Sequence, residues 1–109
     1  MNLKTIVKLG ETITKEYNVM ANDTADFLGN KGVEVLSTPA MIKYMEQTVA
    51  QIIFDKLPQK YRTVGTKIDI KHINPTPVDA KITVKATVKD IKGNKISYNV
   101  EAFNEKDKI

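Results

Sequence analysis

The strictest constraint on this chain is a two-residue alternation of apolar and polar side chains over residues 80–102. In "DAKITVKATVKDI" apolar side chains recur at every second position from Ala80 to Val88, and after a short "KGN" turn "KISYNVEA" continues the alternation. Successive side chains of a strand point to opposite faces, so these segments predict two antiparallel strands with one apolar and one solvent-facing side. The apolar face would consist of Ala80, Ile82, Val84, Ala86, Val88, Ile96, Tyr98, Val100 and Ala102. Such a face must be covered by another element.

One long amphipathic helix is available to cover it. Ser37 and Thr38 precede Pro39, and because proline suits the first helical turn, the helix is expected from about Pro39 to Asp55, with Thr38 as its cap. Pro58 prevents its extension. At about 100° per residue, one continuous half of the helix is apolar apart from a single threonine. This half contains Met41, Ile42, Tyr44, Met45, Thr48, Val49, Ile52 and Ile53, while Ala40 falls on the other, polar half.

The remaining segments complete an α+β pattern. Glu11–Val19 alternates loosely and predicts a strand, and Asp23 or Thr24 is expected to cap a short helix that Gly29 ends. "TVGTKIDIKHI", residues 63–73, predicts another strand, which the prolines of "NPTP" end. The order of a strand, a helix and then strands predicts a single domain over residues 1–109, with an antiparallel sheet wrapped around one central helix.

Composition excludes several classes of function. The net charge of +4 comes from lysines spread along the chain, and there is no tryptophan, so no nucleic-acid surface is expected. No cysteine and a single histidine make a zinc site built by the protein alone improbable. No segment has the length and apolarity of a membrane span or a secretory signal. We therefore expect a cytoplasmic protein without a membrane partner and without a cofactor.

Four residues are candidates for chemistry, although each has an ordinary explanation. Thr38 can simply cap the helix, Glu46 can pair with Lys43 on the surface, and His72 can be a core histidine beside aliphatic residues. Taken together they offer more. Thr38 supplies a hydroxyl at a helix N-terminus, His72 a titratable base, Glu46 a carboxylate, and Gly65 a backbone N–H open to close approach. This set of groups is the one that acyl transfer requires.

The motifs "VLSTPAMIKYME" and "TVGTKIDIKHINPTPV" resemble the hotdog-fold thioesterases, in particular the branch related to fluoroacetyl-CoA thioesterase. The likeness runs from about Glu11 to Phe103. It implies a hotdog fold and hydrolysis of an acyl-CoA or similar thioester to an acid and a free thiol, without a metal or redox cofactor. It also implies that Thr38, Glu46 and His72 are catalytic, with the Gly65 N–H near the thioester carbonyl.

The resemblance further implies a homodimer or higher homo-oligomer with a sheet continuous between subunits. The family continues after "EAFNEKDKI" into one more strand, whereas this sequence stops at Ile109. The sheet is therefore expected to be completed differently or to expose an edge.

Several alternatives stay open at this point. Thr38 can attack the thioester after His72 removes its proton, or it can hold the thioester while His72 or Glu46 activates water. A non-catalytic module that binds acyl-CoA or assembles with partners is the rival function. A hotdog dehydratase fits less well, because its usual histidine–aspartate pattern is absent from the helix. The basic residues Lys56, Lys60 and Arg62 form either a solvated rim or a contact for CoA phosphates.

Overall fold

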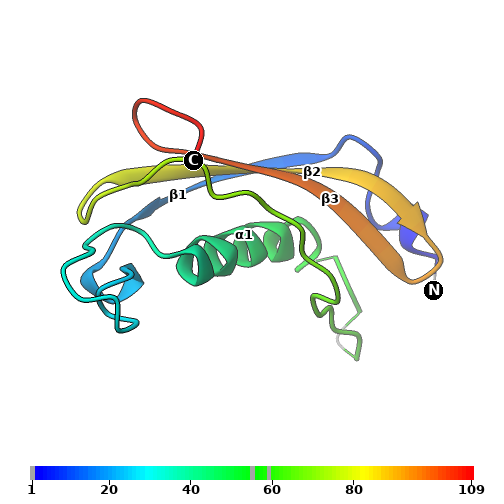
Figure 1. The fold of residues 1–109 in the computed structure, drawn as a ribbon. Helices are drawn as coiled ribbons and strands as arrows, with labels where there is room; N and C mark the ends of the chain where they lie inside the picture. The colour runs from blue at the N-terminus through cyan, green and yellow to red at the C-terminus, as the bar shows by residue number, and fades with distance from the viewer. Residues whose placement is uncertain (1, 55, 59) are drawn as a thin grey trace.

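The computed structural model describes residues 2–54, 56–58 and 60–109, and shows a curved antiparallel sheet with one long helix against its concave face (Figure 1). The elements are a 3-10 turn η1 (Leu3–Thr5), β1 (Thr12–Asn18), a 3-10 turn η2 (Ala21–Asp23), α1 (Thr38–Ile53), β2 (Lys81–Lys92) and β3 (Lys95–Phe103). The three strands lie in the order β1-β2-β3. None of the described helices is long and apolar enough to cross a membrane.

The predicted alternation is confirmed in β2, the central strand. Its side chains at Ile82, Val84, Ala86 and Val88 are buried, and the residues between them face outward. A register shift against β3 falls between Val88 and Asp90, so that the next buried residue is Ile91. Because a bulge inserts one residue and increases the local twist, the hairpin end of the sheet curls over the C-terminal half of α1.

The apolar half of α1 packs on this face in two clusters. Met41, Tyr44 and Met45 belong to the cluster that contains Ile82 and Val84. Ile52 and Ile53 belong to the one that contains Ala86, Val88 and Ile91. The predicted central helix is thus confirmed, although its expected end at Asp55 lies outside the described residues.

Ala40 differs from the prediction that placed it on the polar half of the helix. It is buried in the same cluster as Leu36, a residue of the chain that leads into α1. The first turn of the helix is therefore covered by the preceding segment as well as by the sheet, which a helical projection does not reveal.

The helix cap also differs from the prediction. Ser37, not Thr38, is the N-cap: its backbone is extended and its Oγ accepts a hydrogen bond from the Ala40 N–H at 3.2 Å. The Met41 N–H, which a capping Thr38 would need, donates instead to the Ser37 carbonyl at 3.0 Å. Thr38 is consequently the first helical residue, and its hydroxyl is available for another partner.

Residues 63–73 do not form the strand that their alternation predicts. The segment runs extended beside α1 and pairs with no strand of the described chain. The residues that bond the edge strand β3 on this side are Lys108 and Ile109, which lie between β3 and the end of the segment. Val64 and Ile68 are accordingly 79% and 48% exposed. Its end is held to the last residue of the chain, where the Ile73 N–H donates to the Ile109 carbonyl at 2.6 Å.

The short helix predicted after Asp23 or Thr24 is also wrong. Asp23 is the last residue of the 3-10 turn η2, and Thr24 follows it. The next residues form single turns, in which the Thr24 hydroxyl accepts from the Phe27 N–H and Gly29 has a positive φ of 106°. Two glycines within four residues, Gly29 and Gly32, favour turns over a continuing helix.

The cap assignment can be tested by substitution. Ser37→Ala removes the acceptor for the Ala40 N–H and should lower the free energy of unfolding by about 1 kcal/mol, measured by urea denaturation. Thr38→Ala is the matched control, because it leaves the cap in place and should cost clearly less. A larger decrease in the free energy of unfolding for Thr38→Ala than for Ser37→Ala would identify Thr38 as the capping residue.

Candidate active site

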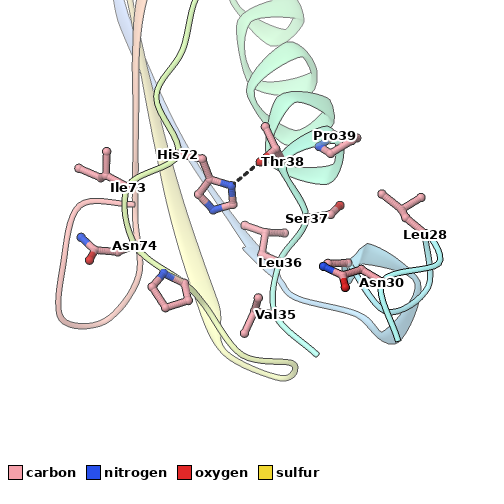
Figure 2. Close-up of a pocket in the computed structure, with 12 residues that line it drawn as sticks. Leu28, Asn30, Val35, Leu36, Ser37, Thr38, Pro39, His72, Ile73 and Asn74 are labelled. Carbon is pink, nitrogen blue, oxygen red and sulfur yellow. Dashed lines mark hydrogen bonds between the residues drawn. The ribbon is translucent and has the colours of Figure 1, made fainter. Parts of the chain in front are cut away.

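The Thr38 hydroxyl and the His72 imidazole meet at the N-terminus of α1. Thr38 Oγ1 lies 2.8 Å from His72 Nδ1, which is hydrogen-bond distance (Figure 2). Thr38 is fixed by the helix, and His72 by the hydrogen bond that its neighbour Ile73 makes to Ile109. The fold thus joins two of the four candidate residues, which are far apart in sequence.

Partial burial favours the neutral form of the His72 imidazole. Desolvation lowers the pKa of His72 below its ordinary value of 6.5, because the charged form loses hydration. Its Nε2 is buried and has no hydrogen-bond partner in the described part of the chain. With the ring proton on Nε2, Nδ1 has a free lone pair and accepts the Thr38 proton; with the proton on Nδ1 the direction reverses. The first tautomer is the one that a general base requires.

The position of Thr38 also favours negative charge on its oxygen. It is the first residue of a 16-residue helix, whose N-terminus carries a partial positive charge from aligned peptide dipoles. A base on one side of the hydroxyl and a helix N-terminus beneath it both stabilise a developing alkoxide. The two effects are independent of each other, since one depends on His72 and the other on the backbone.

A cavity of about 510 Å³ opens beside the pair. Residues 25–30, 35–39 and 72–75 form its wall, and the last of these segments is remote in sequence from the other two (Figure 2). The lining residues are Ala25, Leu28, Asn30, Val35, Leu36, Ser37, Thr38, Pro39, His72, Ile73, Asn74 and Pro75. Most of them are apolar, none is an acid, a lysine or an arginine, and two asparagine amides supply hydrogen-bonding groups. No sequence signal indicates this wall, because loops 25–30 and 73–75 follow no periodic pattern.

Glu46 and Gly65 form a second, separate site. A Cβ built on Gly65 would lie 3.6 Å from Glu46 Oε1, so the carboxylate lies against the glycine backbone. A cavity of about 210 Å³ is lined by these two residues with Thr66, Lys67 and Ile68. Glu46 is eight residues after Thr38 on the same helix, or about 12 Å along its axis. Because Nδ1 of His72 bonds Thr38 and Nε2 bonds no described residue, Glu46 does not orient this imidazole within one chain.

The basic residues after α1 lie at the end of the helix opposite to Thr38. Lys56 forms an ion pair with Glu11, Lys60 lies 5.5 Å from the centre of the Tyr61 ring, and Arg62 Nη1 donates to the Tyr61 carbonyl. The charge of Lys56 is therefore already matched by a carboxylate. A contact of this cluster with CoA phosphates stays a prediction.

The antiparallel sheet that curves over one long helix is the architecture of a hotdog-fold protein. A hot-dog-like protein from Thermanaerovibrio acidaminovorans superposes with a TM-score of 0.91 at 22% identity, over 100% of this chain and 81% of that one. A variant of the fluoroacetyl-CoA-specific thioesterase FlK, solved with fluoroacetate and CoA, superposes with a TM-score of 0.90 at 26% identity, over 94% and 87% of the two chains.

Sequence comparison gives the family. Residues 19–109 match the fluoroacetyl-CoA-specific thioesterase family. The chain is also 26% identical to the fluoroacetyl-CoA thioesterase of Streptantibioticus cattleyicolor, over 98% of this chain and 81% of the relative. This protein therefore belongs to the family of fluoroacetyl-CoA-specific thioesterases, and the predicted hotdog fold and family are confirmed.

The pKa of the His72 imidazole can be measured without a substrate. Since it is the sole histidine, its ring signals in an NMR titration are unambiguous, and they should report a pKa below 6.5. The unfolded chain binds this proton near pH 6.5 and the folded chain does so at lower pH. Stability should thus fall as the pH drops below 6.5, until the folded pKa is reached. A measured pKa above 6.5 would contradict the buried neutral ring.

Proposed function

We propose that Thr38 and His72 form the catalytic pair with which this chain hydrolyses acyl-CoA thioesters to a carboxylic acid and free CoA. Family membership supports the reaction, since the family is one of thioesterases. The observation that carries the assignment is the 2.8 Å contact between Thr38 Oγ1 and His72 Nδ1 at the wall of the larger cavity. A base in contact with a hydroxyl, beside a space for the substrate, is what acyl transfer needs.

The geometry favours a sequence of proton transfers through one ring nitrogen. His72 Nδ1 takes the hydroxyl proton while Thr38 Oγ1 attacks the thioester carbon, and the carbonyl oxygen becomes negative. The carbon–sulfur bond then breaks, and the leaving thiolate takes the proton from Nδ1. Water attacks the acyl-threonine in the same way, giving its proton to Nδ1, which returns it to the departing Thr38 oxygen. A helix N-terminus next to Oγ1 lowers the energy of the charged states.

A second route uses the same pair without an acyl-enzyme. A water molecule attacks the thioester directly, a base takes its proton, and the Thr38 hydroxyl donates a hydrogen bond to the substrate. In this route His72 or Glu46 is the base. The two routes differ in whether an ester on Thr38 ever forms, which mass spectrometry detects.

The wall of the larger cavity favours an uncharged acyl group. Its lining contains no lysine or arginine that would neutralise a carboxylate on the substrate, and an unpaired charge is costly in an apolar site. The fluoroacetyl group named for the relatives is uncharged and falls within this class. We therefore propose a neutral acyl chain, and fluoroacetyl-CoA belongs in the first substrate panel.

A homodimer would unite the two sites that a single chain keeps apart. Residues 63–69 are extended and exposed and lack a strand partner within the described chain, so their backbone is available to another copy. A two-fold axis near α1 would bring Glu46 and Gly65 of one subunit toward Thr38 and His72 of the other. We therefore propose an active site shared between the two subunits of a homodimer. We also propose that the protein is located in the cytoplasm.

Thr38 provides the first test. Release of free thiol from acyl-CoA separates an enzyme from a binding module, and Thr38→Ala should lower kcat by at least about tenfold while the protein stays folded. Thr38→Ser keeps the hydroxyl and should retain most of the turnover. An acyl-enzyme trapped on wild type would establish the covalent route.

Two outcomes would defeat the assignment. A folded Thr38→Ala variant that turns over normally would leave Thr38 without a catalytic role. A wild-type protein that binds acyl-CoA and releases no thiol would favour the non-catalytic module.

The composite site has its own test, which mixes two inactive subunits. Thr38→Ala and Glu46→Gln variants, unfolded together and refolded at equal concentrations, should yield mixed dimers for about half of the population. If the site joins Thr38 of one subunit to Glu46 of the other, each mixed dimer has one intact site, and roughly a quarter of the wild-type activity should return. Either variant refolded alone is the control. No recovery in the mixture, with each variant inactive alone, would contradict a site shared between Thr38 of one subunit and Glu46 of the other.

A further inference from the structure

Asp23 is a buried acid that no part of the catalytic proposal uses. Its side chain is 1% exposed and lies in the turn η2, outside the lining of either cavity. Buried carboxylates are stable only when they are paired and hydrogen-bonded, so its partners indicate why it is there. Apart from the Met20 N–H in the same turn, they all belong to the first two turns of α1 or to its cap.

The main chain of Asp23 holds the helix cap. Its carbonyl accepts a hydrogen bond from the Ser37 N–H at 2.8 Å, and the next residue, Thr24, forms a bridge with Leu36. Ser37 is the N-cap and Thr38 follows it directly. The residue directly before Thr38 is thus hydrogen-bonded to Asp23.

The side chain of Asp23 holds the second turn of the same helix. Oδ1 accepts from Lys43 Nζ at 2.9 Å, and Oδ2 accepts from the Tyr44 hydroxyl and from the Met20 N–H. Burial alone would raise the pKa of Asp23, but the bonds from Lys43 and Tyr44 outweigh it and lower that pKa. The same burial and contact raise the pKa of Tyr44 to about 12. Asp23 is therefore charged and Tyr44 remains a donor at neutral pH.

Tyr44 links this cluster to the sheet. Its ring centre lies 4.4 Å from that of Tyr17 on β1, and the Tyr17 hydroxyl is 2.9 Å from Thr48 Oγ1, one turn further along α1. Apolar packing alone is non-directional and allows a helix to slide or rotate slightly on a sheet. Directional bonds at Ser37, Lys43 and Tyr44 prevent both movements.

We propose that Asp23 is a positioning residue, which sets Thr38 Oγ1 at hydrogen-bond distance from His72 Nδ1. The inference rests on the proposed function of that pair, and it assigns Asp23 no contact with the substrate. Displacement of about 1 Å between reacting groups is enough to cost a large factor in rate. Loss of the Asp23 charge should therefore affect the chemical step more than substrate binding.

Asp23→Asn tests the inference, because it keeps the shape and removes the charge. His72 is the sole histidine, so the ¹⁵N signal of its Nδ1 reports directly on the bond to Thr38. We expect this signal to move in the same direction as in Thr38→Ala, kcat to fall by about tenfold, and KM to stay within about twofold. Tyr44→Phe removes one donor to the carboxylate and should give a smaller change of the same kind.

The matched control is Glu11→Gln. It removes a carboxylate that pairs with Lys56 beyond the opposite end of α1, and it should leave both the His72 signal and kcat unchanged. If Asp23→Asn does not fold, Tyr44→Phe decides with the same two measurements.

Three results separate the outcomes. A folded Asp23→Asn variant with an unchanged His72 signal overturns the inference, whether or not kcat falls. An equal effect of Glu11→Gln also overturns it, because the response would then be one of general stability. If wild type releases no thiol, the proposed function fails, but a His72 signal that moves in both Asp23→Asn and Thr38→Ala would still support the positioning role.

Discussion

The packing of α1 on the inner face of β2 is the contact on which the rest of the structure depends. Four alternate residues of the central strand, Ile82 to Val88, are buried against the helix. Burial of each of the three larger ones, Ile82, Val84 and Val88, contributes about 1.5–3 kcal/mol. This contact fixes which side of the helix faces the sheet, and with it the side that faces the extended segment carrying His72. The apolar contact thus sets the orientation of the helix, within which Thr38 and His72 come into contact.

Apolar contacts and polar contacts contribute differently to this structure. The two clusters along α1 supply most of the stability but tolerate small shifts, since their energy depends little on direction. Polar bonds from Asp23 and Ser37 are few, yet they are directional and lie at the end of the helix where Thr38 is located. The N-terminal end of α1 is therefore positioned by directional bonds as well as by packing. The C-terminal end is held mainly by apolar packing.

How much can be predicted from the sequence depends on the range of the interaction. The alternation in β2 and β3 and the apolar half of α1 are local patterns, and both predictions are correct. The predicted cap is wrong by one position, because Ser37 and Thr38 are both good capping residues and only the hydrogen bonds distinguish them. Residues 63–73 have a strand-like pattern, but a strand needs a neighbour. The role of Asp23 escapes a local pattern because its partners, Lys43 and Tyr44, are about twenty residues away.

The placement of Ser37 and Thr38 has a consequence for how this protein can change. The two adjacent hydroxyls have different partners, since one satisfies the helix backbone and the other meets the imidazole. Aspartate or asparagine can replace the first, because either caps a helix equally well. In the proposed function the second position requires a hydroxyl that can give its proton to His72, which restricts it to serine or threonine. Substitutions at position 37 can therefore change the stability of the helix without altering the hydroxyl that contacts His72. Substitutions at position 38 can change that hydroxyl without removing the cap.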